Sequence, residues 1–123
     1  MTTYIEDGSI GAPDPDEVEI AVFGPNYGEC ILVHLGVSNW VVIDSCIASG
    51  APAALTYLNA IKVDPSIALK SIVVTHWHDD HCRGLSKLIE AAPSATLCLA
   101  SALTEREFLQ FQARMLENRT TVK

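Results

Sequence analysis

Short runs of apolar residues, separated by Gly, Pro and Asn, dominate the first half of the chain. The runs are rich in Val and Ile, which favour β-strands, and turn-forming residues bound each of them. Three runs predict the first strands of a sheet, at residues 18–24, 30–36 and 40–44. The sequence GVSN, between the second and third runs, predicts a tight turn that joins these two strands.

Helical and strand patterns alternate in the rest of the chain. Helices are predicted where apolar residues recur at helical spacing, and strands where apolar residues are continuous. The helices fall at residues 52–62, 85–92 and 104–119, and the strands at 71–75 and 95–100. Pro52 suits a first helical position, and Thr104 and Glu107 have capping-box spacing. The unbroken apolar run at 71–75 is typical of a strand covered on both faces.

The resulting order, β-β-β-α-β-α-β-α, predicts an α/β protein in which helices cover a layered sheet. A length of 123 residues is enough for one domain, and 49% hydrophobic residues with 19% charged residues exclude general disorder. Residues 1–16, rich in Gly, Pro and acidic side chains, are predicted to form a flexible N-terminal arm. Residues 17–123 form the predicted folded unit.

The net charge of −7 argues against a broad basic surface for nucleic acid, although bound divalent metals invert the local field at a site. The sequence has no secretory signal and no membrane span, so we expect a cytoplasmic protein that does not contact a membrane. The cysteines lie in or beside apolar runs, which predicts buried or half-buried thiols rather than disulfides. They are Cys30, Cys46, Cys82 and Cys98. His34, alone inside a strand, is predicted to be structural.

The sequence HWHDDH, residues 76–81, crowds three histidines and two aspartates directly after a predicted strand. Without a common partner these groups would repel and desolvate one another, so a purely structural role is disfavoured. Imidazole nitrogens and carboxylate oxygens are preferred ligands of zinc and similar ions. In a loop, alternate residues converge, so His76 and His78 could hold one ion, while Asp80 and His81 face a second.

The pattern H-x-H-x-D-H after an apolar strand ending in Thr, here VVTHWHDDHCRGL, resembles the signature of the metallo-β-lactamase superfamily. The resemblance implies two divalent metal ions, with zinc foremost and manganese or iron as alternatives. His76 and His78 would bind the first ion, and Asp80 and His81 the second. Asp80 would also act in catalysis by orienting the attacking water. The upstream VVIDSC resembles the family's strand ending in an aspartate, which implies that Asp44 supports the metal-bound histidines.

The sequence GPNYGECILVHLG, followed by NWVVIDSC, is most similar to the branch that includes the soluble domain of ComEC-type DNA-uptake proteins. In that branch a glycine-rich turn precedes the second strand, and here Gly28 and Cys30 occupy it. Similar sequences occur among metallohydrolases of bacterial anti-phage defence operons. The resemblance implies a phosphodiesterase or nuclease whose substrate is a phosphodiester, with nucleic acid as one candidate. The alternatives are a non-catalytic or regulatory zinc-binding module, or an inactive fragment.

Three residues beside the predicted ligands have open roles. Trp77 either walls the pocket and contacts substrate or anchors its loop against the sheet. Arg83 either meets an anionic substrate or is a solvated side chain. Asp79 fills a variable position of the motif and is predicted to be a polar loop residue.

The family's fold is a four-layer αβ/βα sandwich of two similar halves, with the active site between them. The resemblance here covers residues 17–103, the first half only, and the second half would supply the remaining metal ligands. No histidine follows His81, and the late carboxylates lie in helical patterns facing away from any strand end: Glu90, Glu105, Glu107 and Glu117. We therefore expect a partner, either a missing C-terminal half or a second copy of the chain, on an apolar face of the sheet.

Overall fold

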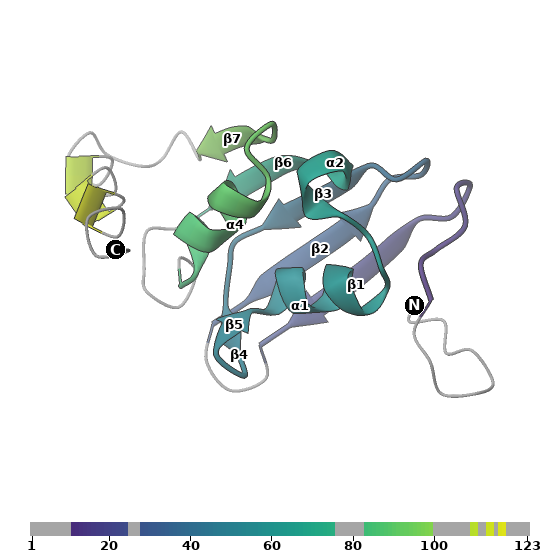
Figure 1. Ribbon diagram of the computed structural model, residues 1–123, viewed down its shortest axis with the longest axis horizontal. Coiled ribbons are helices and arrows are strands. Elements are labelled where there is room, and N and C mark those ends of the chain that lie inside the picture. The colour runs from purple at the N-terminus through teal and green to yellow at the C-terminus, as the bar shows by residue number, and fades with distance from the viewer. Residues whose placement is uncertain are drawn as a thin grey trace.

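A five-stranded sheet forms the centre of the computed structural model, which describes residues 11–24, 28–75, 83–99, 109–110, 113–114 and 116–117 (Figure 1). The strand order in the sheet is β1-β2-β3-β6-β7. The bounds are β1 (Glu19–Phe23), β2 (Cys30–His34), β3 (Trp40–Ile43), β6 (Leu69–Val74) and β7 (Thr96–Leu99). The first three strands are antiparallel neighbours, whereas β6 runs parallel to both β3 and β7.

Three helices lie on one face of this sheet (Figure 1). They are α1 (Ala53–Ala60), α2 (Pro65–Ala68) and α4 (Leu85–Ala91). Alternate residues of the strands point toward the helices, because successive side chains of a strand point to opposite faces. The buried core includes Leu32 of β2, Val42 of β3, Ile72 of β6, Leu58 of α1 and Leu88 of α4. The predicted α/β fold and its order of main elements are therefore confirmed.

Two small elements were not predicted. A hairpin of two-residue strands, β4 (Ile47–Ala48) and β5 (Ala51–Pro52), precedes α1. Pro52 pairs with Ile47 and stands at the N-cap of α1, so the helix begins one residue later than expected. Helix α2 begins with Pro65 after Asp64, whose side chain accepts a hydrogen bond from the Ser66 N–H. Residues 109–110, 113–114 and 116–117 are helical, as expected.

The sheet face opposite the helices is apolar. Neighbouring strands place side chains there in two rows, which are Ile20–Val33–Val41–Ser71–Thr96 and Val22–Ile31–Ile43–Val73–Cys98. These rows define the back face. Their members are half-buried or exposed, with Ile20 at 52% and Val22 at 69%. The expectation that β6 is covered on both faces is wrong for the described part of the chain, because all three helices lie on the other side.

The turn between β2 and β3 forms as predicted. The Asn39 N–H donates to the Gly36 carbonyl and the Leu35 N–H donates to the Asn39 carbonyl. Both central residues, Val37 and Ser38, have positive φ, at 48° and 55°. That backbone matches the twist of a two-residue hairpin loop.

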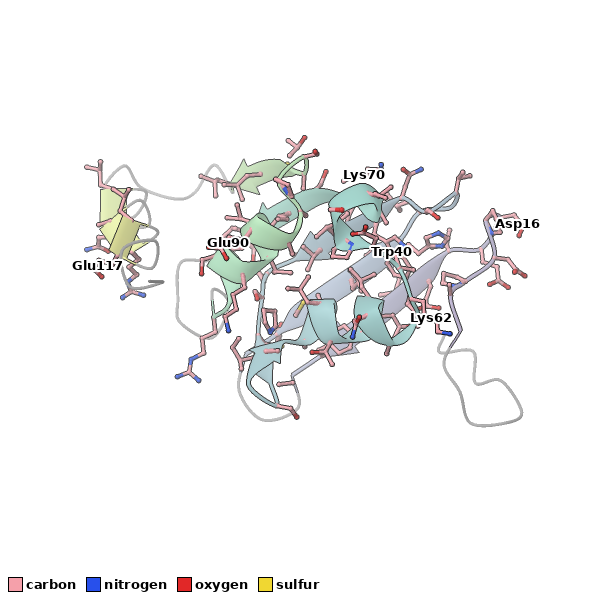
Figure 2. All side chains as sticks on the ribbon, in the orientation of Figure 1. Asp16, Trp40, Lys62, Lys70, Glu90 and Glu117 are labelled. Carbon is pink, nitrogen blue, oxygen red and sulfur yellow. The ribbon has the colours of Figure 1, made fainter. Side chains whose placement is uncertain are left out.

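Four aromatic rings pack together between the sheet and α1. Trp40 lies 4.8 Å from His34 and 6.4 Å from Tyr57 between ring centroids, and Phe23 lies 5.5 Å from Tyr57. Figure 2 shows Trp40 inside the molecule, whereas Lys70 and Glu90 are at its surface. His34 is buried, and its Nδ1–H donates to the Glu17 carbonyl at 2.8 Å. These contacts confirm that His34 is structural.

The cysteine prediction holds for two of the three described thiols. Cys30 and Cys46 are buried and free, whereas Cys98 is free but exposed. The prediction is wrong for Cys98 because β7 is the last strand of the described sheet and no described helix lies over this residue on the back face. Cys82 lies outside the described residues. In the described ranges, no helix is long and apolar enough to cross a membrane.

Candidate functional site

The carboxyl ends of β3 and β6 lie side by side in the sheet. These strands pair in parallel, with Ile43 opposite Val73, and the Asp44 N–H extends the pairing by donating to the Val73 carbonyl at 2.8 Å. Ligand sites of open α/β sheets gather at such carboxyl ends. Thr75 follows β6 at this edge, and segment 76–82 comes directly after Thr75 in the sequence.

Asp44 fixes the residue that precedes this segment. Its Oδ1 accepts a hydrogen bond from the Thr75 N–H at 2.8 Å, and the Thr75 hydroxyl donates to its Oδ2. The carboxylate is 5% exposed, so these bonds form in a poorly solvated place where charge-assisted hydrogen bonds are strong. Asp44 thus holds the residue directly before His76. Its predicted supporting role toward the histidines themselves stays a prediction.

Ser45 contacts the other end of the same segment. Its hydroxyl donates to the Arg83 carbonyl oxygen at 2.6 Å, and the serine is fully buried. Ser45 was not among the residues predicted for the site. A usable signal was present, because a small hydroxyl residue directly after a strand-end aspartate is well placed to bond neighbouring backbone.

The predicted metal ligands are His76, His78, Asp80 and His81, and Asp80 is also the predicted catalytic residue. All four lie outside the described residues, as do Trp77 and Asp79. Among the residues that the structure does describe, no group of three or more His, Cys, Asp or Glu is gathered to hold a metal. Glu90 and Glu117 are exposed on helical turns, as predicted, while Glu105 and Glu107 are outside the described ranges. Arg83 is exposed at the end of the segment.

The chemistry of the donor set and its placement fit divalent metal binding. Segment 76–82 carries three imidazoles and two carboxylates, which are ligands of first-row divalent ions. The residues on both sides of it are held by hydrogen bonds to two adjacent buried residues. Anchored flanks of this kind reduce the conformational freedom that metal ligands lose on binding.

Two buried thiols lie beneath this edge of the sheet. Burial, and then the nearby Cys46 and Asp44, raise the pKa of the Cys30 thiol to about 12. Burial also raises the pKa of Cys46. A thiol must lose its proton to bind a metal. At neutral pH, and without a bound metal, both thiols are therefore protonated and pack in the core.

The comparison with protein families gives one match. The sequence profile of the Metallo-beta-lactamase superfamily matches residues 23–106, which is more than half of the chain. No curated protein matches the chain.

Solved structures give further matches. The chain is similar to the metallo-beta-lactamase SMB-1 bound to 2-mercaptoethanesulfonate, with 22% identity and a TM-score of 0.50, over 63% of this chain and 29% of that chain. A complex of SMB-1 with mercaptoacetic acid matches at 22% identity and a TM-score of 0.49, over 65% and 29%. MIM-1 from Novosphingobium pentaromativorans matches at 28% identity and a TM-score of 0.46, over 58% and 29%. The matched part of the chain therefore covers under a third of the length of these proteins.

Proposed function

Because the chain belongs to the metallo-β-lactamase superfamily, we propose that it forms the metal-binding half of a metal-dependent hydrolase. One observation carries the proposal. The H-x-H-x-D-H segment follows the carboxyl end of a central parallel strand in the sequence, and the two residues that flank it are held by hydrogen bonds to the buried Asp44 and Ser45. The fold of the sheet and its helices is that of the first half of the superfamily's sandwich.

The proposed roles divide the segment in two. His76 and His78 hold one divalent ion, and Asp80 and His81 hold a second, with zinc as the expected metal. When bound, such ions supply a water of lowered pKa and stabilise developing negative charge on the substrate. Asp80 would also orient the attacking water. Asp44 holds Thr75, and through it the backbone from which His76 projects.

Within this class, we propose a phosphodiester as the substrate. The support is the ComEC-like pattern of residues 24–46 and the exposed Arg83 directly after the segment, since guanidinium groups match phosphate geometry. Trp77 is the second candidate for substrate contact. The similarity to SMB-1, at 22% identity, supports the fold and does not select a substrate.

A second αβ unit with an apolar sheet surface is proposed to cover the back face and to complete the ligand set. The two rows of mostly apolar side chains support a sheet-on-sheet contact, in which inner faces interdigitate. The unit's source is either another copy of this chain or a C-terminal half.

Hydrolysis assays on the purified chain with added zinc test the proposed activity. A chromogenic phosphodiester and a chromogenic cephalosporin are offered in parallel to the wild type, Asp80→Ala and Asp79→Ala. We expect phosphodiester turnover that Asp80→Ala loses by at least about a hundredfold, because it removes both a ligand and the water-orienting group. Asp79→Ala is the matched control, since it removes the neighbouring carboxylate from a variable position.

Full turnover by Asp80→Ala would contradict the mechanism. Preference for the cephalosporin would contradict the substrate class alone. Tight zinc without any turnover, together with unfolding on chelation, would favour the alternative of a structural or regulatory zinc module.

A further inference from the structure

Two adjacent residues hold both ends of segment 76–82. Asp44 accepts hydrogen bonds from Thr75, which immediately precedes the segment, and Ser45 donates to Arg83, which immediately follows it. Each bond joins residues more than 30 positions apart in the chain, since the two separations are 31 and 38. The two residues that flank the segment, Thr75 and Arg83, are therefore held by adjacent residues of the scaffold.

The backbone at Asp44 makes this double contact feasible. Its φ is +60°, in the left-handed region that non-glycine residues seldom adopt. An extended strand would send the side chains of Asp44 and Ser45 to opposite faces of the sheet. The left-handed residue interrupts that alternation, so that one side chain reaches the end of β6 while the next reaches the start of α4.

A glycine supports the same end of the segment as Ser45. Gly84 has φ of +77°, and a Cβ at this position would lie 2.6 Å from Ile47 Cδ1 and 2.9 Å from Pro52 Cγ. The backbone therefore packs directly on the β4–β5 hairpin. Helix α4 starts at once, with the Leu88 N–H donating to the Gly84 carbonyl at 3.1 Å. Arg83 is thus placed between a buried hydroxyl and a tightly packed helix start.

We propose that Ser45 is a positioning residue for the second metal. The proposal rests on the proposed function, in which Asp80 and His81 bind that ion. Each further residue from a fixed point adds up to about 3.5 Å of reach, so positional freedom grows with distance from the anchor. His81 is two residues from Arg83, whereas His76 directly follows Thr75. The Ser45 bond therefore governs the second ion, and Asp44 governs the first.

Zinc titration of the full chain against a chromophoric chelator tests the proposal, using the wild type, Ser45→Ala and Ser66→Ala. Ser66 is the matched control, because its hydroxyl also makes a short hydrogen bond, at 2.7 Å to Asp64, but lies exposed at α2. In Ser45→Ala we expect the second zinc to bind about tenfold more weakly, in the range seen for groups that orient metal ligands. The first zinc and Ser66→Ala should be little changed. Equal weakening of both ions, or of neither, would overturn the proposal.

Hydrogen exchange of the metal-free chain separates this role from a general loss of stability. Peptides covering 76–88 should exchange faster in Ser45→Ala, whereas peptides from β1 to β3 should match the wild type. Faster exchange across the whole chain, or none, would refute the anchoring role. Failure of the wild type to bind zinc would instead refute the proposed function and the role assigned to Ser45 in metal binding, while the exchange result would still decide whether Ser45 anchors the segment.

Discussion

Asp44 combines two energetically unfavourable properties with hydrogen bonds that offset them. It is buried, it has a left-handed backbone, and both of its carboxylate oxygens accept hydrogen bonds from Thr75. A buried carboxylate is stable only when its oxygens are satisfied, and left-handed backbone at a non-glycine residue is also unfavourable. The described bonds to Thr75 offset the cost of burial and hold the residue before the predicted ligands.

Asp44→Asn should lower the free energy of unfolding by about 1–3 kcal/mol, because an amide nitrogen replaces one of two buried charged acceptors. Urea denaturation in a metal chelator measures this loss. Asp64→Asn is the control, since Asp64 also accepts from one backbone N–H and one hydroxyl but is exposed. Asparagine caps helices as well as aspartate does, so we expect almost no effect there. Equal losses in both variants would contradict the account of Asp44.

Cys30 makes the free energy of unfolding depend on pH in the alkaline range. Burial raises the pKa of its thiol from 9.0 to about 12 in the folded chain. Its contribution to stability is therefore complete below pH 9 and is lost as pH rises toward 12, by at most about 1.4 kcal/mol per pH unit. Tyr57 adds to the loss above pH 10, because burial and its hydrogen bond to Glu19 raise its pKa.

Denaturation curves between pH 8 and 11 check the thiol's part. The stability difference between wild type and Cys30→Ala should shrink above pH 9, because the variant lacks the group whose ionisation favours the unfolded chain. The exposed Cys98→Ala should follow the wild type. A constant difference between wild type and Cys30→Ala across this range would show that Cys30 does not titrate as described.

The turn between β2 and β3 is an element whose sequence does not suit its backbone. Val37 is a β-branched residue with φ of 48° and its side chain is 73% exposed, so packing does not require it. Val37→Asn should raise the free energy of unfolding by about 0.5–1 kcal/mol, because asparagine tolerates the left-handed region. Its N–H can still donate to the Pro15 carbonyl.

Urea denaturation of Val37→Asn and of the control Val22→Asn measures the change in the free energy of unfolding that each substitution causes. Val22 is also exposed, at 69%, but lies in extended strand β1, where asparagine is unfavourable. The account predicts opposite signs for the two changes. Destabilisation by Val37→Asn would contradict the importance of backbone strain in this turn.

Helices and strands were predicted correctly where apolar residues recur along the sequence with a clear period. The Val- and Ile-rich runs became β1, β2, β3 and β6, and helical spacing located α1 and α4. The β4–β5 hairpin and α2 escaped notice because strands of two residues and a single helical turn have no measurable periodicity. The bend at Asp44 was also invisible in sequence, since its left-handed backbone is stabilised by Thr75, 31 residues away.

At the scale of the whole molecule, the back face is the proposed contact surface for a second αβ unit. Ile20→Lys combined with Val22→Lys should leave the stability of the free chain within about 0.5 kcal/mol, because both side chains are already exposed. The double change should abolish association with a second αβ unit, because it buries two charges in an apolar contact. Light scattering over a range of concentrations, combined with binding to a separately expressed candidate unit, measures this association.

Ile67→Lys is the control, because Ile67 is as exposed as Val22, at 69%, but lies on α2 on the other side of the sheet. Association that survives the double change and is lost in Ile67→Lys would place the contact on the helical side. That result would contradict the proposed partner surface.

The chemistry of the site was readable in sequence because it is local: three histidines and two aspartates fall within six positions. Only one of the two residues that hold the flanks of the site could be predicted from the sequence. Asp44 was assigned a supporting role, whereas the bond from Ser45 to Arg83 depends on how β3, the hairpin and α4 meet in space. Cys98 was misjudged for the same reason, because an edge position cannot be deduced from an apolar run.

Native mass spectrometry of the chain with added zinc tests the central claim, that segment 76–81 binds two divalent ions. We expect two zinc ions bound per chain, one of which is lost in His81→Ala, while Asp79→Ala retains both. The same spectra give the mass of any complex, and so report whether a second copy is needed for binding. Absence of bound zinc, or full retention of both ions in His81→Ala, would contradict the account.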